Sequence, residues 1–179
     1  TILAKNTSIT YKDYKINISD TPGHADFGGE VERIMHMVDG VLLLVDAFEG
    51  VMPQTRFVLQ KALEAKIKPI VVVNKIDRDF ADPQRVLNEV YDIFIDLGAS
   101  DNDLDFPVLY GSSLNAKMDF EPSLDHNKGM TPLLDTIVKE ISEPIKKDVD
   151  YLLFQPSLIE YNNFVGRMGV GKIYSGKIE

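Results

Sequence analysis

The sequence contains no cysteine, so no disulfide holds its fold together and a reducing compartment is allowed. It also lacks long apolar stretches: no run approaches the roughly 20 residues that a membrane-spanning helix needs. Basic residues are outnumbered: 19 Lys and Arg face 28 Asp and Glu, which gives a formal net charge of −9. An acidic balance argues against a broad nucleic-acid-binding surface. We therefore expect neither a membrane nor DNA as a partner.

What is present is the composition of an ordinary globular protein, with 44% hydrophobic and 26% charged residues in 179 positions. Continuous apolar runs alternate with helical patterns, and apolar runs without polar alternation are typical of parallel strands covered on both faces. This order predicts an α/β fold with a doubly wound sheet. The expected strands are 41–45, 70–73 and 106–110, and the expected helices are 26–38, 54–65, 83–97 and 131–141.

The two ends of the chain are predicted to differ from this central part. Residues 2–9 and 14–18 are predicted as a hairpin at a sheet edge, with a turn at 11–13. The polar stretch 117–130 is predicted as a surface loop, and a change of composition indicates a linker at 144–150. The predicted domains are 1–143 and 151–179, the latter being the beginning of a β-barrel with strands at 151–160 and 165–178.

Polar residues gather where the predicted strands end. The parallel strands of a doubly wound sheet place their carboxyl ends at one edge, and ligands bind beyond that edge. We expect four strand ends to converge there, and a convergence of this kind is a stronger signal than any single motif. The polar residues at these ends are 20–24, Asp46, 74–77 and 111–113.

The stretch Asp20-Thr21-Pro22-Gly23-His24 follows a β-prone run and precedes a helical pattern. A carboxylate at the end of a strand can hold Mg²⁺ through water, and a glycine lets a backbone N–H come close to a phosphate oxygen. An imidazole just beyond could position a water molecule for attack. The stretch therefore suits the handling of a metal-bound phosphate.

The string Asn74-Lys75-Ile76-Asp77 follows the second apolar run. A carboxylate can accept two parallel hydrogen bonds from the N1–H and N2–H₂ groups of guanine, whereas adenine presents no such pair of donors. Asp77 would therefore select guanine. The stem of Lys75 can lie along the face of the base, and Asn74 can tie neighbouring loops together. Residues 111–114 would offer a backbone N–H to the guanine O6.

In order and spacing, these motifs resemble the GTPase domain of translational GTPases, the group that contains elongation factors G and Tu. The resemblance covers essentially the whole chain and implies a P-loop GTPase-type sheet. Within the group, three segments are most similar to the TypA/BipA proteins. These segments are Asp46-Ala47-Phe48-Glu49-Gly50-Val51-Met52-Pro53-Gln54-Thr55-Arg56, Asn74-Lys75-Ile76-Asp77-Arg78 and Leu104-Asp105-Phe106-Pro107-Val108.

The resemblance implies hydrolysis of GTP to GDP and phosphate, with Mg²⁺ as cofactor, the ribosome as partner and the cytoplasm as location. Two residues would hold Mg²⁺: Thr1, in the place of the switch I threonine, and Asp20, through water. The N–H of Gly23 would contact the γ-phosphate, and His24 would be the catalytic residue that orients the attacking water. The implied nucleotide-binding residues are Asp20, Gly23, Asn74, Lys75, Asp77, Ser112, Ser113 and Leu114.

One part of such a site is missing, because the pattern G-x-x-x-x-G-K-[ST] does not occur in the sequence. Its backbone, lysine and hydroxyl hold the phosphates and Mg²⁺. In the family this loop and the first strand precede the position of Thr1, so we expect the chain to be a piece of a longer protein. The missing strand would lie between the strands that end at Asp20 and Asp46. Either these two strands pair directly, or a gap remains for a strand from another segment or chain.

Several functions stay open at this point. The complete protein is expected to be a GTPase of the TypA/BipA type, with an elongation factor G-type protein as an alternative. A second class is a catalytically inactive structural or interaction module that binds no nucleotide or metal. A third possibility, a P-loop NTPase that prefers adenine, is disfavoured by Asp77.

Overall fold

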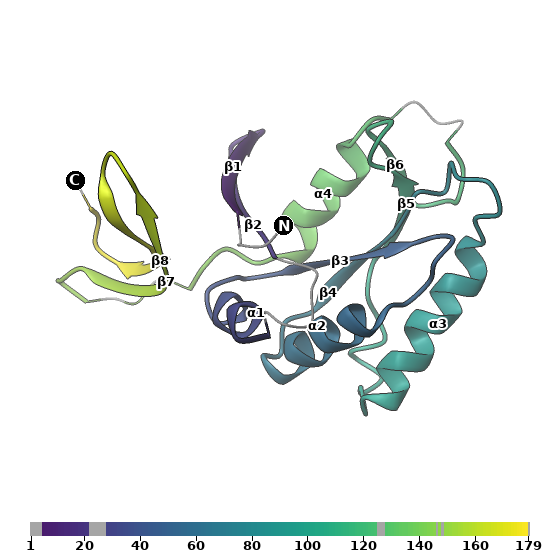
Figure 1. Cartoon of the computed structure of the whole chain (residues 1–179), viewed down its shortest axis with the longest axis horizontal. Coiled ribbons are helices and arrows are strands. Elements are labelled where there is room, and N and C mark those ends of the chain that lie inside the picture. The colour runs from purple at the N-terminus through teal and green to yellow at the C-terminus, as the bar shows by residue number, and fades with distance from the viewer. Residues whose placement is uncertain (1–4, 22–27, 125–127, 146, 148, 179) are drawn as a thin grey trace.

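The computed structural model describes most of the chain, and no helix in that part is long and apolar enough to cross a membrane. The described residues are 5–21, 28–124, 128–145, 147 and 149–178. The strands are β1 (Lys5–Tyr11), β2 (Tyr14–Asp20), β3 (Val41–Asp46), β4 (Pro69–Asn74), β5 (Val108–Ser112), β6 (Lys117–Asp119), β7 (Leu153–Asn162) and β8 (Gly166–Ser175). The helices are α1 (Gly28–Met35), α2 (Pro53–Glu64), α3 (Pro83–Asp96) and α4 (Thr131–Glu140) (Figure 1).

A four-stranded sheet in the order β3-β4-β5-β6 forms the centre of the fold. Strands β3, β4 and β5 are parallel, and β6 runs antiparallel to β5. Strand β4 is buried from Pro69 to Val73, because it has a neighbouring strand on each side and helices over both faces. Its continuous apolar sequence is therefore explained by its central place in the sheet.

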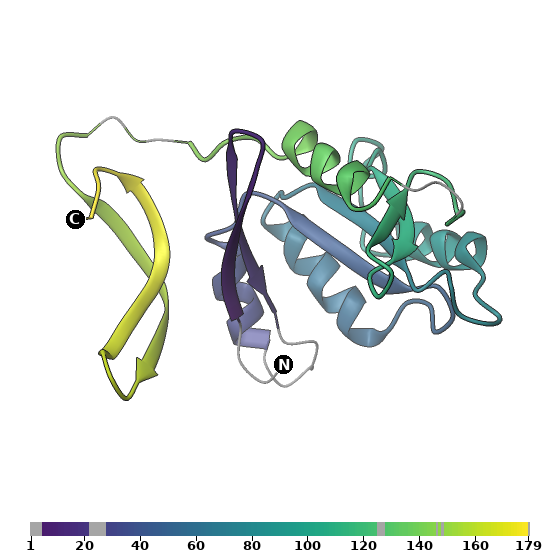
Figure 2. The same cartoon turned by 90° about the horizontal axis from the view of Figure 1, so that it is seen from above.

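Helices cover the two faces of this sheet, as Figures 1 and 2 show from two directions. On one face, Leu59 of α2 and Phe94 of α3 belong to a core cluster that includes Val73 of β4. On the other face, Leu133 of α4 belongs to a cluster that includes Val72. Successive residues of β4 thus point into different cores. The doubly wound α/β fold predicted from the sequence is confirmed.

The strands at the two ends of the chain form hairpins that are sheets of their own. Between β1 and β2, Lys12 has a φ of 52°, a left-handed conformation that suits a two-residue hairpin turn. The hairpin tip is tied to α4, because Tyr11 Oη and Lys12 Nζ both donate to Asp135 Oδ1, at 2.9 and 2.6 Å. In Figure 2 the β7–β8 hairpin lies on the side of the β1–β2 hairpin that faces away from the central sheet. That it opens a second, β-barrel domain stays a prediction.

Strand β3 is the outer strand of the central sheet. Among the strands that the structure describes, β3 pairs with β4 alone, and β2 pairs with β1 alone. Direct pairing of the strands that end at Asp20 and Asp46, one of the two outcomes expected above, is therefore wrong. The second outcome, a gap beside β3, agrees with this pairing, since the outer edge of β3 has no strand partner in the described part of the chain.

The expectation of a surface loop from residue 117 to 130 is wrong at its beginning, where β6 pairs with β5. Met118 and Asp119 of β6 are buried, and Lys128 Nζ lies 2.9 Å from the Asp119 carboxylate. Strand β6 can lie this close to β5 because residue 111 of β5 is glycine. A Cβ at this position would lie 2.2 Å from the Lys117 carbonyl oxygen. A three-residue strand with a charged residue at each end carries too short a pattern to be recognised in the sequence.

Candidate functional site

Three of the four predicted strand ends come together at one edge of the central sheet. Asp46 lies opposite Asn74 in the β3–β4 pair, and Asn74 lies opposite Gly111 in the β4–β5 pair. Beyond the strands, Ala47 N–H donates to the Asn74 carbonyl at 2.8 Å and Ile76 N–H donates to the Gly111 carbonyl at 3.2 Å. The sheet ladders thus continue into the loops and fix where these loops begin.

The side chain of Asn74 joins the loop after β4 to the loop after β5. Its Oδ1 accepts hydrogen bonds from both the backbone N–H and the Oγ of Ser113, each at 3.0 Å. An amide oxygen has two lone pairs, so these two bonds use its full accepting capacity. The Asn74 side chain therefore helps to set the relative position of the two loops.

The carboxylate of Asp77 is linked to the buried end of β5. Asn115 Nδ2 donates to Asp77 Oδ2 at 3.4 Å and to Ser112 Oγ at 3.0 Å. The backbone N–H of Asn115 donates to the same Ser112 Oγ at 3.3 Å. Ser112 is only 1% exposed, whereas Asp77 is exposed to solvent. A surface carboxylate is thus connected through one amide group to a fixed point in the core.

Ion pairs connect the end of β3 to the loop after β4. Lys75 has a φ of 63°, in the left-handed region, and its Nζ donates to Asp46 Oδ2 at 2.6 Å. Arg78 Nη1 donates to the same oxygen at 3.2 Å, and its guanidinium carbon lies 5.8 Å from the centre of the Phe48 ring. The ion pair with Asp46 helps to hold Lys75 in a backbone conformation that residues with a Cβ seldom adopt.

The setting of Asp46 changes its acidity. Its side chain is only 10% exposed, and burial alone would raise the pKa. The hydrogen bond from Lys75 and those from the N–H groups of Phe48 and Glu49 outweigh burial and lower the pKa from 3.8 to about 2. Asp46 therefore stays ionised near neutral pH and keeps its attraction for Lys75 and Arg78.

The predicted phosphate side is less completely described than the base side. Asp20 is exposed at the end of β2, and β2 belongs to the separate hairpin. Of the four strand ends predicted at the edge of the central sheet, three therefore belong to that sheet and the one at Asp20 does not. A single exposed carboxylate fits Mg²⁺ held through water, because this ion keeps several water ligands. No group of three or more His, Cys, Asp or Glu in the described residues could hold a metal ion. Thr1, Gly23 and His24 lie outside the described residues.

The predicted base-side residues lie together at the sheet edge, and sequence reasoning missed two of their partners. Leu114, which follows the tie between Asn74 and Ser113, is 90% exposed. The missed residues are Asn115 and Arg78, whose side chains reach Asp77 and Asp46. An asparagine three residues after a serine at a strand end was the only signal for Asn115, and such a pattern is too common to be recognised.

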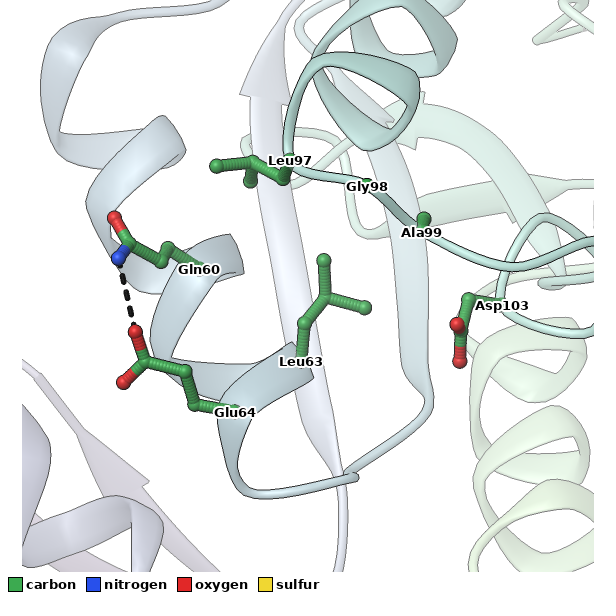
Figure 3. A pocket seen from close by; sticks show the side chains of 7 residues that line it. All are labelled: Gln60, Leu63, Glu64, Leu97, Gly98, Ala99 and Asp103. Atoms are coloured by element: carbon green, nitrogen blue, oxygen red, sulfur yellow. Dashed lines mark hydrogen bonds between the residues drawn. The ribbon is translucent and has the colours of Figure 1, made fainter.

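A cavity of about 340 Å³ lies away from this edge (Figure 3). It is formed where α2 and α3 end, and helices of a doubly wound sheet end at the amino edge of the parallel strands. None of the predicted site residues that the structure describes lines this cavity, so it is separate from the described part of the candidate site. The lining residues are Gln60, Leu63, Glu64, Leu97, Gly98, Ala99 and Asp103.

Comparison with known proteins gives three findings. The family model described as "Elongation factor Tu GTP binding domain" matches residues 1–143. The chain is 56% identical over its whole length to the large ribosomal subunit assembly factor BipA of Bacillus subtilis, and 56% identical to that of Haemophilus influenzae. It covers 29% of the length of each of these relatives. The resemblance to TypA/BipA proteins is therefore confirmed.

The third finding concerns the fold. The structure matches translation elongation factor SelB of Methanococcus maripaludis, solved in complex with a GTP analogue, with a TM-score of 0.72. The match covers 97% of this chain and 36% of that chain at 21% identity. At this identity the likeness shows a shared fold, which agrees with the α/β architecture described above.

Proposed function

This chain belongs to the family of the elongation factor Tu GTP binding domain, and from that premise we propose that it is part of the domain with which a TypA/BipA-type factor binds and hydrolyses GTP. The proposal concerns the complete protein, by which we mean this chain with any flanking sequence that its gene encodes. The observation that carries it is the set of side-chain bonds that joins the loops after β4 and β5, because recognition of guanine would use residues from both loops.

On the base side, Asp77 would select guanine by accepting hydrogen bonds from N1–H and N2–H₂. Its carboxylate is exposed, and the bond from Asn115 occupies only one of its four lone pairs. The Nζ of Lys75 is held by Asp46, which leaves the carbon stem of Lys75 available for the face of the base. Ser113, fixed by Asn74, would place the backbone N–H groups of this loop near the guanine O6.

On the phosphate side, Asp20 and Thr1 would hold Mg²⁺, Gly23 would donate its N–H to the γ-phosphate, and His24 would orient the attacking water. Mg²⁺ bound with the nucleotide would neutralise charge on the phosphate oxygens. The contribution of these residues is mainly to position groups and to stabilise charge, since hydrolysis of a phosphoanhydride needs little covalent chemistry from the protein.

The Asp77→Asn variant tests the base-reading role. An asparagine offers one donor and one acceptor, which matches the N1–H and O2 of xanthine and no longer matches guanine. We expect the complete protein to bind GDP and not ADP. We expect the variant to lose GDP affinity by about tenfold or more and to gain affinity for xanthosine diphosphate. Isothermal titration calorimetry with the three nucleotides measures these changes.

The Asp79→Asn variant is the matched control, since Asp79 is exposed in the same loop and is not in the predicted base pocket. It should keep the nucleotide preference of the unmodified protein. Unchanged guanine selectivity in Asp77→Asn would refute the role of Asp77. A complete protein that bound GDP no better than ADP would refute the proposed function as a whole.

The ribosome is the proposed partner, and the cytoplasm the proposed location. Both relatives named above are described as assembly factors of the large ribosomal subunit, and this chain shares 56% identity with each of them. Sedimentation of the complete protein with ribosomal subunits, in the presence of GDP or a non-hydrolysable GTP analogue, tests the partnership. Association with the large subunit that depends on the GTP analogue would support it. Equal amounts in the pellet with and without ribosomes would contradict it.

A second candidate function, an interaction module that binds no nucleotide, applies to the 179 residues as they stand. The observation in its favour is the absence of the pattern G-x-x-x-x-G-K-[ST] from the sequence. Each hydrogen bond between a charged group and a phosphate contributes roughly 1.5–3 kcal/mol, so loss of the lysine and the loop should cost several kcal/mol of affinity. Micromolar binding of GDP by these residues alone would rule the second function out.

A further inference from the structure

We propose that Asn115 is a positioning residue for guanine recognition, which holds the Asp77 carboxylate in the orientation that accepts the base. This inference rests on the proposed function of the same site. Nothing in the motif that contains Asp77 points to Asn115, which lies 38 residues further along the chain. The role follows from the place of its amide group between an exposed acceptor and a buried one.

The amide nitrogen of Asn115 has two hydrogens, and the structure gives each an acceptor. One is Asp77 Oδ2 at 3.4 Å, and the other is Ser112 Oγ at 3.0 Å. The backbone N–H of Asn115 also donates to Ser112 Oγ, at 3.3 Å. Since Ser112 is 1% exposed and ends β5, the amide group is fixed to the rigid part of the sheet.

Asp77 needs such support because it is exposed and lies in the loop that begins with the left-handed Lys75. To accept two parallel hydrogen bonds, both of its carboxylate oxygens must face the edge of the base. A side chain that is free to rotate loses that freedom on binding, and this loss reduces affinity. The bond from Asn115 restricts the rotation beforehand. It leaves one lone pair on Oδ2 and both on Oδ1 for the guanine donors.

The alternative role for Asn115 is purely structural, because its backbone bond to Ser112 Oγ closes the turn after β5. The two roles differ in what they predict for aspartate at this position. Aspartate suits turns as well as asparagine does, so a structural role predicts that Asn115→Asp is tolerated. The positioning role predicts the opposite, because aspartate has no N–H to donate and places a second negative charge beside Asp77.

The test compares the complete protein with its Asn115→Asp and Asn115→Ala variants. The probes are GDP, ADP and inosine diphosphate, whose base is guanine without the 2-amino group. We expect both variants to lose about tenfold in GDP affinity, with the larger loss in Asn115→Asp. We also expect the preference for GDP over inosine diphosphate to shrink, because an unsupported carboxylate no longer meets both guanine donors together. Isothermal titration calorimetry gives the three dissociation constants.

A matched control is Asn162→Ala, which removes another turn asparagine, one that accepts hydrogen bonds from the N–H groups of Phe164 and Val165. This variant should bind the three nucleotides as the unmodified protein does. Urea unfolding of each variant, followed by circular dichroism, checks that the domain is folded in the titrations.

Each outcome decides between the roles. A shrunken preference for GDP over inosine diphosphate in both variants supports the proposal. Equal losses for the two nucleotides, or normal binding by Asn115→Asp, would overturn it while the guanine-binding function stands. An unmodified protein that binds GDP no better than ADP would overturn both.

Discussion

Replacing Asp46 by asparagine should destabilise the protein by an amount that depends on pH. Asp46 Oδ2 accepts hydrogen bonds from Lys75 Nζ at 2.6 Å and from Arg78 Nη1 at 3.2 Å, and the other oxygen accepts from two backbone N–H groups. Asparagine has nearly the same shape, but its amide nitrogen is a donor, so the substitution removes both the charge and one of the two acceptor oxygens. The part of the effect that varies with pH then measures what ionised Asp46 contributes to folding.

The magnitude follows from the pKa of Asp46. Burial works to raise this pKa, and the bonds from Lys75 and the backbone lower it from 3.8 to about 2. At about 1.4 kcal/mol per pH unit, this difference in pKa corresponds to about 2 kcal/mol of folding free energy. Because the pKa is lower in the folded protein than in the unfolded chain, this contribution is fully present above about pH 4 and is lost as the pH falls towards 2.

The assay is urea unfolding of the unmodified protein and the Asp46→Asn variant at several pH values. We expect a difference in unfolding free energy of about 2 kcal/mol near pH 7, which declines steadily between about pH 4 and pH 2 as Asp46 takes up a proton. Comparison of the two proteins at each pH cancels the titration of other carboxylates. The Asp105→Asn variant is the control, since the Asp105 side chain is 94% exposed and lies 3.7 Å from Lys68. A difference for Asp46→Asn that stayed constant across this range would refute the reasoning.

Four further variants test the surroundings of single residues. Gly111→Ala should destabilise the protein by about 1–3 kcal/mol in urea unfolding, because its Cβ would meet a backbone oxygen of β6 at 2.2 Å. Gly29→Ala in α1 should instead stabilise by up to about 1 kcal/mol, because in the described part of the chain no atom beyond its chain neighbours and the backbone of its own helix lies within 4 Å of the added Cβ. A similar sign for both glycines would contradict the close approach of β6 to β5. Asn74→Ala leaves the backbone and Oγ of Ser113 without their acceptor, so amide hydrogen exchange in the loop after β5 should become faster, and unchanged exchange would contradict the tie. Asp135→Asn should speed exchange at the tip of the β1–β2 hairpin while the central sheet keeps its protection, and equal acceleration in both would show that the hairpin is not docked there.

The central sheet could be predicted because burial on two faces leaves an unambiguous pattern. A strand such as β4, covered by helices on both sides, tolerates only apolar residues from Pro69 to Val73. Helices α2 and α3 could be predicted from Pro53 and Pro83. Each proline lies in the first turn of its helix, where its missing N–H costs no hydrogen bond. Strand β6 left no such pattern, because it is three residues long and its place depends on a glycine in the neighbouring strand.

The candidate site was predictable as a set of strand ends and not as a set of contacts. The polar residues after β4 and β5 could be expected at one edge, since parallel strands share a direction. The pairing of Asp77 with Asn115, or of Asp46 with Arg78, depends on which rotamers bring groups from distant segments within reach, and periodicity carries no information on that. The hairpin that ends at Asp20 is a further case, because a separate two-stranded sheet and an edge of the main sheet have the same alternation of residues.

The tie between the β1–β2 hairpin and α4 has a consequence for synthesis of the protein. The two bonds to Asp135 span 124 and 123 residues of sequence, whereas the hairpin itself is closed by local contacts. A ribosome adds about 5–20 residues per second, so the hairpin emerges roughly 6–24 s before the helix on which it docks. During that interval its two open edges can pair with other extended chains, and we expect early intermediates of this protein to be substrates for chaperones that bind nascent polypeptides. Pulse-labelled nascent chains, truncated before and after α4, would show whether protection of the hairpin from proteolysis begins only once α4 has been made.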